Sequence, residues 1–535
     1  MSGSYVANLL SLWALSLLLA FAFRRSRRII RFAMLVAAGA TALLAAICLV
    51  SQFTQTQSSA AALRRVTPAA GAFLSAAAIP QLAAWALAWI RRDLPRLAAA
   101  GRRHAAWTLA TLGLFAAVTA GCLWLGSQLA DRRAFDEYDT LFFADPPRYM
   151  SLMQSGAVTI DAAVYKHPLF ALIASAICRP AMRLLSPAAA SVFVSAFFAG
   201  LAAALAMQYF RLILGRCDVA FGLAATLAMT PAHLLFGSVP ETYAMSAAGL
   251  VALHLLVAVA MRANLGDRPL AGLSAPGRIR QTGRRPVLHS GPLPATGRCP
   301  VIPLRWAAPA ALLAIGATAT HLVTALICVP PLRDRRRRRA ARWAATLLLC
   351  GVAGLALQHG VSSDLAPAGS PAAMHAEEGY VTTATLRNPA ATTFNVARAI
   401  AAESLVGPSI RIERDNLGRR GVRMGSYFTP LQRLALGGAW TLALALLIRI
   451  LRHAHYRRPT FRAAAACLAF SAVLHLFYGN NHVFLFSCTY TFCTLAIFAH
   501  GLIAAPRILL FATALVALLV VSDNVCFIAE VLGRS

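Results

Sequence analysis

Long apolar runs, separated by short arginine-rich connections, constrain this chain more than any other feature of its sequence. Of the 535 residues, 59% are hydrophobic and 13% are charged, and the mean hydropathy is +0.64. A soluble domain carries nearer a quarter charged residues. A helix of about 20 apolar residues spans the hydrocarbon core of a bilayer. The sequence therefore predicts an all-α polytopic membrane protein with the lipid bilayer as its surroundings.

About twelve of the runs predict full transmembrane helices. Two more, 167–186 and 306–332, are predicted to be re-entrant hairpins. If both crossed fully, the basic connections at 262–305 and 335–339 would fall on opposite sides of the membrane, against the positive-inside rule. The predicted full spans lie near 6–23, 29–50, 69–90, 105–129, 188–212, 218–237, 243–261, 343–357, 430–451, 461–478, 484–504 and 508–522.

The placement of charge supports this topology. The chain has 50 Lys and Arg against 19 Asp and Glu, a formal net charge of +31. Lys166 is the single lysine, and so strong an arginine bias is most simply that of a GC-rich genome, so the charge is no argument for a nucleic-acid partner. With two hairpins, the arginine clusters fall on the cytoplasmic side. Most carboxylates fall outside, in 131–161, at Glu241 and in 364–415, so we expect the outer loops to form the working cavity.

Composition divides the chain into four parts. The insert 263–304 is rich in Gly, Pro, Arg and Ser and has no apolar period, which predicts a disordered cytoplasmic linker. In the largest outer loop, 393–404 has apolar residues at helical spacing and predicts a short helix on the membrane face. The first arginines follow the first apolar run, which predicts an uncleaved helix with its N-terminus outside. The four parts are extra N-terminal transmembrane helices at 1–104, a transmembrane core at 105–357 with an acidic outer loop at 130–166, an extracytoplasmic loop at 358–429 and C-terminal transmembrane helices at 430–535.

The eleven cysteines fall singly, mostly inside apolar runs, with no CxxC pair and no metal-ligand spacing. We interpret them as small core residues. The sequence leaves open whether a divalent metal takes part in the function.

The first acidic outer loop holds a candidate pair of catalytic carboxylates. Asp136 and Asp139 are three residues apart, which on a helix places both on one face. Two neighbouring carboxylates can divide the work between a general base and an orienting group or metal ligand. The alternative is a solvated loop, in which acidic residues are ordinary.

Three other polar sites flank predicted spans. Lys166 and His167 stand at the mouth of the first hairpin, where a snorkelling lysine and a helix-capping histidine are the alternative. Glu241 is the only acid in an outer turn, and it could instead cap the helix that follows. His321 lies midway along the second hairpin among apolar residues, where a histidine satisfied within the core is the alternative.

A polar cluster joins two late spans outside the membrane. Asn480, Asn481 and His482 lead directly into the aromatic stretch at 483–487, although Gly and two Asn also suit a plain turn. By the predicted topology all of these sites open on the same side of the membrane. That convergence, together with the outer arginines at 411–423, indicates a shared extracytoplasmic site.

At these residues the sequence resembles the GT-C superfamily of membrane glycosyltransferases, in the broad group of the protein O-mannosyltransferases and lipid A aminoarabinose transferases. There are two departures: four spans precede the acidic loop where the family usually has one, and the loop reads Asp-Glu-Tyr-Asp at 136–139 in place of Asp-x-Asp. The matching parts follow in order over 105–330 as an acidic outer loop (Asp136 to Asp145), an HPLF segment (His167 to Phe170), an acidic turn (Pro240 to Ala244) and a GATATHL hairpin (Gly316 to Leu322), with VFLFS at 483–487 as a late outer turn.

The resemblance implies transfer of a sugar from a polyprenyl-phosphate donor to an extracytoplasmic acceptor with inversion, the acceptor being a protein, lipid A or a glycan. It implies an enzyme of the bacterial inner membrane whose active site faces the periplasm. Asp136 or Asp139 would be the general base. The donor phosphate would be held by Lys166, His167, His321, Arg411 and Arg414, and substrate would be contacted by Glu241, Tyr243, Asn480, Asn481 and His482.

Two other functions stay open. A flippase or transporter for lipid-linked sugars would also be polytopic, although such proteins usually show related halves and ionisable groups inside their spans. An O-antigen ligase or polymerase would share the large outer loop bearing arginines. The sequence identifies neither the sugar nor the acceptor.

Overall fold

The computed structural model describes residues 105–138, 141–155, 167, 170–266, 314, 318, 321–328, 388–414, 420–478 and 483–534. Several predictions fall elsewhere in the chain. The predicted spans at 6–23, 29–50, 69–90 and 343–357, nearly all of the linker 263–304, and the residues Asp139, Lys166, Asn480, Asn481 and His482 lie outside the described residues.

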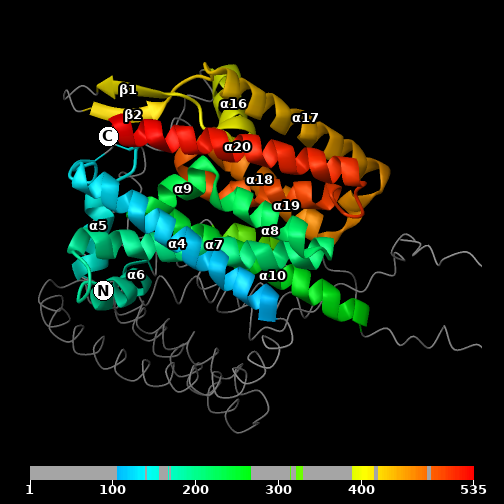
Figure 1. Ribbon diagram of the computed structural model, residues 1–535, viewed down its shortest axis with the longest axis horizontal. Helices are drawn as coiled ribbons and strands as arrows, with labels where there is room; N and C mark the ends of the chain where they lie inside the picture. Colours follow the sequence, from blue (N-terminus) through cyan, green and yellow to red (C-terminus); the bar gives the residue numbers. More distant parts are fainter. Residues whose placement is uncertain are drawn as a thin grey trace, which may run out of the picture.

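The described chain folds as a bundle of roughly antiparallel helices (Figure 1). Its N-terminal half contains α4 (Ala105–Asp131), α5 (Pro146–Ser155), α6 (Phe170–Ala181), α7 (Pro187–Leu214), α8 (Cys217–Ala228), α9 (Pro231–Ser238), α10 (Tyr243–Gly266) and α12 (His321–Cys328). Its C-terminal half contains α16 (Pro389–Arg398), the π-helix η3 (Ala399–Glu403), β1 (Ile410–Arg414), β2 (Arg420–Met424), α17 (Pro430–Arg452), the 3₁₀ turn η4 (His455–Arg457), α18 (Pro459–Phe477), the 3₁₀ turn η5 (Val483–Phe486), α19 (Ser487–Gly501) and α20 (Arg507–Arg534).

Six described helices are long and apolar enough to cross a bilayer: α4, α7, α17, α18, α19 together with η5, and α20. Two of them are central, because 72% of the most apolar window of α7 and 78% of that of η5–α19 are buried inside the protein. Only 17% of the corresponding window of α20 is buried, and large apolar side chains such as Phe511 and Leu518 are exposed on it. Exposed apolar surface of this extent suits a lipid environment. The predicted helical membrane protein is confirmed in this coarse form, whereas twelve spans and two re-entrant hairpins stay predictions.

The predicted span at 218–237 is not one straight helix. It consists of α8 and α9, which meet at an angle of 58°. Thr230 has the extended backbone that a residue before proline prefers, and Pro231 begins α9. The break leaves the carbonyl of Met229 outside a regular helix, and the buried amide of Asn524 on α20 donates a 2.9 Å hydrogen bond to it. Within a bilayer such a break requires a partner of this kind.

Local sequence explains several helix boundaries. The Thr429 hydroxyl accepts a hydrogen bond from the backbone N–H of Gln432, whose side chain in turn accepts from the backbone N–H of Thr429, and Pro430 is the first residue of α17.

The helix predicted at 393–404 is confirmed over a longer range, since α16 and η3 run from 389 to 403. The sequence did not predict the antiparallel pair β1–β2, in which Ile410 pairs with Met424. Helix α10 continues to Gly266 and so includes the first residues of the predicted linker.

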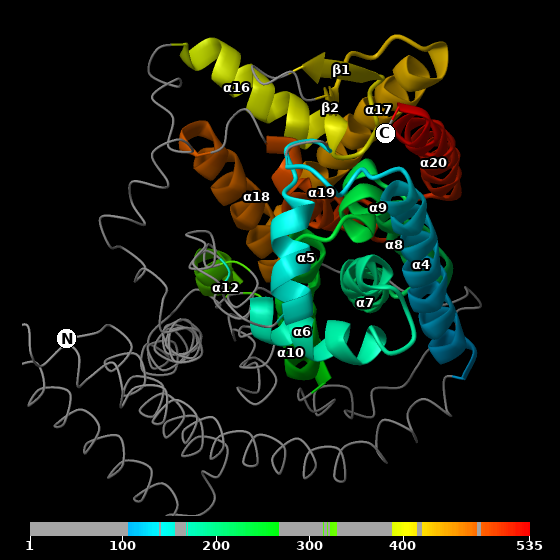
Figure 2. The ribbon, with the colours of Figure 1, turned by 90° about the vertical axis from the view of Figure 1, so that its left-hand side faces the viewer.

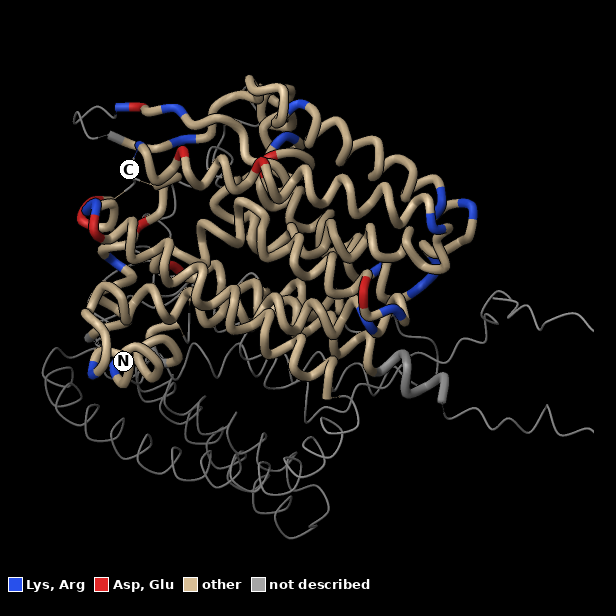
Figure 3. The backbone as a smooth tube through the Cα atoms, viewed as in Figure 1, with Lys and Arg blue, Asp and Glu red and all other residues tan. Residues whose placement is uncertain are grey.

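The bundle has two ends of different character. The loop end comprises residues 132–138, 141–155, 239–242, 408–414, 420–428 and 483–486, whereas the arginine end comprises the turns at 215–217, 453–458 and 502–506. Arginine positions gather at both ends, and most of the described acidic positions lie toward the loop end (Figure 3). At the arginine end, Arg449 donates hydrogen bonds to the carbonyls of Gly501, Ile503 and Ala504 and so caps the end of α19.

Candidate functional site

Segments far apart in the sequence meet at the loop end, which faces the viewer in Figure 2. The first acidic loop is hydrogen-bonded to the β-hairpin, because the backbone N–H of Phe142 donates a 2.9 Å hydrogen bond to the carbonyl of Val422. The Phe142 ring also lies 5.5 Å from the ring of Phe484 in η5. The acidic loop, the hairpin and the late turn are therefore parts of one surface.

The acidic loop is conformationally strained where it meets the hairpin. Phe142 and Phe143 have φ angles of 53° and 66°, a left-handed conformation that is uncommon for bulky side chains. The buried guanidinium of Arg423 lies over the Phe143 ring, 3.6 Å from its centroid. Strain of this kind persists only where the surrounding structure enforces it, and it is concentrated at functional sites.

A buried carboxylate anchors the acidic loop to the turn between α9 and α10. Oε1 of Glu241 accepts a 2.7 Å hydrogen bond from the backbone N–H of Asp145, and Oε2 accepts one of 3.3 Å from Thr242. The Ser195 hydroxyl accepts a hydrogen bond from the backbone N–H of Glu241 and donates one to the backbone carbonyl of the same residue. Glu241, which is 2% exposed, thus positions two segments relative to each other.

Charged neighbours surround this carboxylate. Burial is the main cause that raises the pKa of Glu241 well above its ordinary value, and the nearby Asp145 carboxylate raises it further. The two backbone N–H groups and the Arg148 guanidinium oppose that rise. Arg148 also forms a 3.0 Å ion pair with Asp145, and its guanidinium carbon lies 5.8 Å from the centroid of the Tyr138 ring. Asp145, Arg148 and Glu241 therefore form one interacting charged group.

Next to this group, Tyr149 connects to the predicted site residue His167. The Tyr149 hydroxyl and Nε2 of His167 are 3.2 Å apart, within hydrogen-bonding distance. Both side chains are buried, and Phe170 at the start of α6 packs edge-on against the Tyr149 ring. His167 thus lies at the loop end, with its ring nitrogen paired to a hydroxyl that can donate or accept a proton.

Asp136 lies on the outer side of the same loop. It is exposed, and within the described residues its carboxylate forms no ion pair. It lines an open depression of about 600 Å³ together with Phe135, Pro147, Met150, Ser151 and Gln154. An accessible carboxylate beside a cavity of this size can reach the hydroxyl group of a bound molecule.

The predicted phosphate-binding arginines lie on the hairpin. Arg411 is exposed and pairs with Glu413 at 2.8 Å, and Arg414 is exposed at the end of β1. Both present guanidinium groups at the loop end. A guanidinium keeps its charge and matches the geometry of a phosphate.

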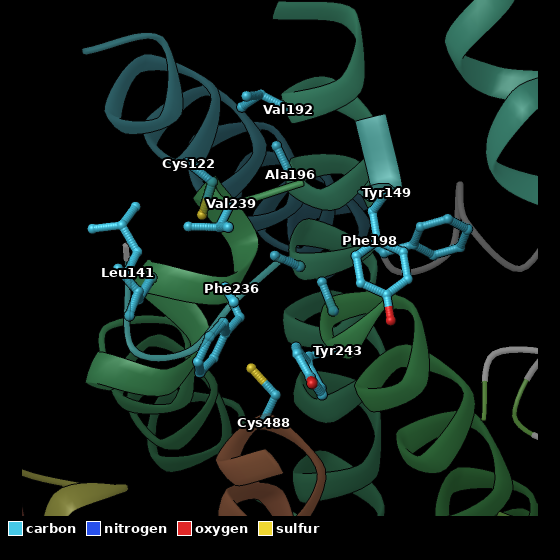
Figure 4. Close-up of a cluster of buried hydrophobic side chains, with 14 of the residues drawn as sticks. Cys122, Leu141, Tyr149, Val192, Ala196, Phe198, Phe236, Val239, Tyr243 and Cys488 are labelled. Atoms are coloured by element: carbon cyan, nitrogen blue, oxygen red, sulfur yellow. The ribbon is translucent and has the colours of Figure 1, made fainter. Parts of the chain in front are cut away.

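Two of the predicted site residues, Tyr243 and His321, are packed among buried side chains. Tyr243 is packed in an aromatic group with Phe236 and Phe486, at centroid distances of 5.2 and 5.6 Å, and Figure 4 shows it within the buried apolar cluster. His321 is buried in α12, and its Nδ1 lies 3.1 Å from Oγ1 of Thr324 on the same helix. The structure brings Glu241, His167, Arg411 and Asp136 to the loop end, but it buries His321 at the start of α12, in the interior of the bundle.

The sequence patterns did not single out Asp145, Arg148 or Tyr149 as site residues, whereas Arg423 belongs to the outer arginines at 411–423 that they did include. The string Asp-Pro-Pro-Arg at 145–148 does carry a local signal, since an acid before a proline at the first helical position and an arginine three residues later is a typical helix start. The contact with Glu241 has no local signal. Among the described residues, no trio of His, Cys, Asp or Glu side chains with metal-ligand spacing lies at the loop end.

Comparison with known proteins does not name a family for this chain. No model of a known protein family matches it, and no curated protein does so either.

Proposed function

We propose that the protein is a membrane glycosyltransferase that moves a sugar from a polyprenyl-phosphate donor to an acceptor on the loop-end side of the membrane, with inversion. The observation that carries this proposal is the meeting of the acidic loop, the Glu241 turn, the arginine-bearing hairpin and η5 at one end of an apolar bundle. Such an arrangement suits a substrate with a lipid tail in the bilayer and a charged, sugar-bearing head at its surface.

The chemical step requires a base and a cationic site. A carboxylate takes the proton of the acceptor hydroxyl while the acceptor oxygen bonds to the anomeric carbon. The bond from that carbon to the phosphate oxygen breaks, and polyprenyl phosphate leaves with the electron pair. A positioned base contributes about 10²- to 10⁴-fold. Exposed Asp136, beside the open depression, supports this role for it or for Asp139, and Glu241 serves to position the loop because backbone groups engage both its oxygens.

The leaving phosphate needs positive charge held in place. Arg411 and Arg414 on the hairpin are the described arginines that we assign to it, because they are exposed at the loop end. We also assign a hydrogen bond to the donor head group to His167, which pairs with Tyr149 at the loop end, and a charge contact to Lys166, which precedes it in the chain. We assign His321 no contact with the phosphate, since its hydrogen-bond partner lies within α12.

The second candidate is a flippase for lipid-linked sugars. The observation in its favour is the burial of ionisable side chains within apolar helices, namely His233, His254 and Asp523. A flippase would move the donor between leaflets without cleaving it.

A reconstituted assay distinguishes the two. The full chain is placed in liposomes with a labelled polyprenyl-phosphate sugar and a panel of acceptors: a serine- and threonine-rich peptide, lipid A and an oligosaccharide. Sugar on an acceptor with release of polyprenyl phosphate supports the transferase. Redistribution of intact donor between leaflets, with no release of polyprenyl phosphate for any acceptor, refutes it. The double variant Asp136→Asn/Asp139→Asn should lose transfer, and Asp218→Asn, at the arginine end, is the matched control.

A further inference from the structure

Near the middle of the bundle, three helices bring together side chains that are far apart in the sequence. His254 lies near the middle of α10, Cys467 lies near the middle of α18, and Cys328 ends α12. All three are buried, with exposures of 1%, 1% and 5%. One ligand atom from each lies within 4.8 Å of those of the other two. This arrangement, which we call the thiol–imidazole cluster, has no role in the proposed transfer reaction.

The contacts within the cluster are close. Sγ of Cys328 lies 3.9 Å from Nδ1 of His254, and Sγ of Cys467 lies within 4.8 Å of Sγ of Cys328 and of a ring nitrogen of His254. Cys493 of α19 is 1% exposed and lies near the middle of its own helix. Three thiols and an imidazole thus share one apolar interior.

One ring nitrogen of His254 is hydrogen-bonded within its own helix, and the other has no hydrogen-bond partner. Nδ1 of His254 donates a 3.0 Å hydrogen bond to the carbonyl of Leu250, which leaves Nε2 as the nitrogen with the lone pair. Nε2 is buried and has no hydrogen-bond partner. A buried polar atom without a partner is costly and calls for an explanation. Metal-binding histidines commonly donate their other ring N–H to a backbone carbonyl in this way.

We propose that His254, Cys328 and Cys467 bind a thiophilic metal ion, with Zn²⁺ as the favoured occupant. Thiolate sulfur and neutral imidazole nitrogen are the ligands that zinc prefers. On binding, the thiols of Cys328 and Cys467 each release a proton, so the ion, two thiolates and a neutral imidazole have no net charge. A neutral complex is the form that an apolar interior tolerates best.

The site requires the ligand side chains to move inward and the His254 ring to present Nε2 to the ion, because Nδ1 is the nitrogen that lies 3.9 Å from Sγ of Cys328. Zinc binds sulfur at about 2.3 Å and nitrogen at about 2.0 Å, so the ligand atoms of a tetrahedral ion lie less than about 4 Å apart. The three ligand atoms, now within 4.8 Å of one another, need to move inward. The ion would then cross-link α10, α12 and α18. That role is structural and is independent of the proposed transferase activity.

Metal analysis of the whole protein tests the site. The full chain, purified in detergent without a metal-affinity tag, should contain stoichiometric zinc by mass spectrometry. The double variant Cys328→Ser/Cys467→Ser should lose it, whereas Cys122→Ser/Cys178→Ser, which removes two buried cysteines outside the cluster, should keep it. Replacement of zinc by Co²⁺ should produce the absorption band of thiolate-to-cobalt charge transfer.

A second measurement on the unaltered chain guards against variants that fail to fold. Removal of the metal with a chelator should lower the thermal midpoint, and Zn²⁺ alone should restore it. Equal metal content in the chain and the Cys328→Ser/Cys467→Ser variant would overturn the proposal. So would a disulfide among Cys328, Cys467 and Cys493 in a metal-free protein whose stability does not respond to added Zn²⁺.

Discussion

The backbone N–H of Asp145 donates a 2.7 Å hydrogen bond to the buried carboxylate of Glu241, 96 residues further along the chain. This bond joins the acidic loop to the turn between α9 and α10. Arg148 extends the connection, because it pairs with Asp145 and interacts favourably with the Glu241 carboxylate. One buried side chain therefore holds the Asp145 end of the acidic loop against this turn, while the hydrogen bond from Phe142 to Val422 holds the loop against the hairpin.

Replacement of Glu241 should change how stability depends on pH. Burial raises the pKa of Glu241 in the folded protein, while the unfolded chain has the ordinary value of about 4.5. The folded state therefore binds the proton more tightly, and this contribution to stability is full below pH 4.5 and is lost as pH rises through the folded-state pKa. We expect Glu241→Gln to flatten the decline of the thermal midpoint with rising pH. A decline as steep as that of the unaltered protein would contradict this account.

The candidate bases should affect the chemical step. We expect Asp136→Asn or Asp139→Asn to lower kcat by about 100-fold or more, with little change in donor binding, because a base acts in the transition state. Turnover of labelled donor and equilibrium binding are the two measurements. The control is Asp218→Asn, an exposed acid at the arginine end that pairs with Arg216. Turnover within a few-fold of the parent in both single variants and in the double variant would refute the assignment.

The hairpin arginines should affect donor binding. A hydrogen bond to a charged group contributes roughly 1.5–3 kcal/mol, so Arg411→Gln or Arg414→Gln should raise the Kd of polyprenyl-phosphate sugar by about tenfold or more. Binding of the uncharged polyprenol should change little. Arg457→Gln, also exposed but at the arginine end, provides the matched control. An equal loss of affinity for the charged and the uncharged lipid would mean that these arginines do not bind the phosphate.

Asn524 should be essential for stability. Its fully buried amide donates to the carbonyls of Met229 and Leu405 and accepts from the N–H of Gly407. Asn524→Ala leaves these buried backbone groups without a partner, at a cost of about 1–3 kcal/mol for each. We expect a clearly lower thermal midpoint in detergent, while Cys526→Ala, at an exposed position of the same helix, should leave it unchanged. A normal midpoint for the Asn524 variant would contradict the arrangement.

The predicted topology places the loop end outside the cell and the arginine end inside. Membrane-impermeant maleimide should label Tyr138→Cys in intact cells and label Arg457→Cys only after permeabilisation. Both residues are exposed. Each labelling cysteine is introduced into a variant in which exposed Cys217 and Cys526, and also Cys48, Cys299 and Cys350, are replaced. The buried cysteines are kept in that variant. The reverse pattern of labelling would invert the topology and place the site in the cytoplasm.

Local sequence patterns predicted much of the helical framework. The spans near 105–129, 188–212 and 430–451 correspond to α4, α7 and α17, because apolar side chains over some 20 residues decide the free energy of burial without help from distant segments. The break between α8 and α9 was missed, although Thr230-Pro231 is a local signal for it. The β-hairpin was missed because its arginine-rich strands, such as Arg-Gly-Val-Arg-Met at 420–424, lack a clear alternation of apolar residues.

The sequence by itself determined that this is a helical membrane protein with charge concentrated between its apolar runs, since both properties depend on residues close together in the chain. Only the tertiary structure decided which charges meet. The Asp145–Glu241 contact and the thiol–imidazole cluster join residues from distant helices and loops. The cysteines show no metal-ligand spacing in the sequence, yet helix packing places Cys328 and Cys467 beside His254. Such pairings depend on the relative position and rotation of packed helices, which no local pattern specifies.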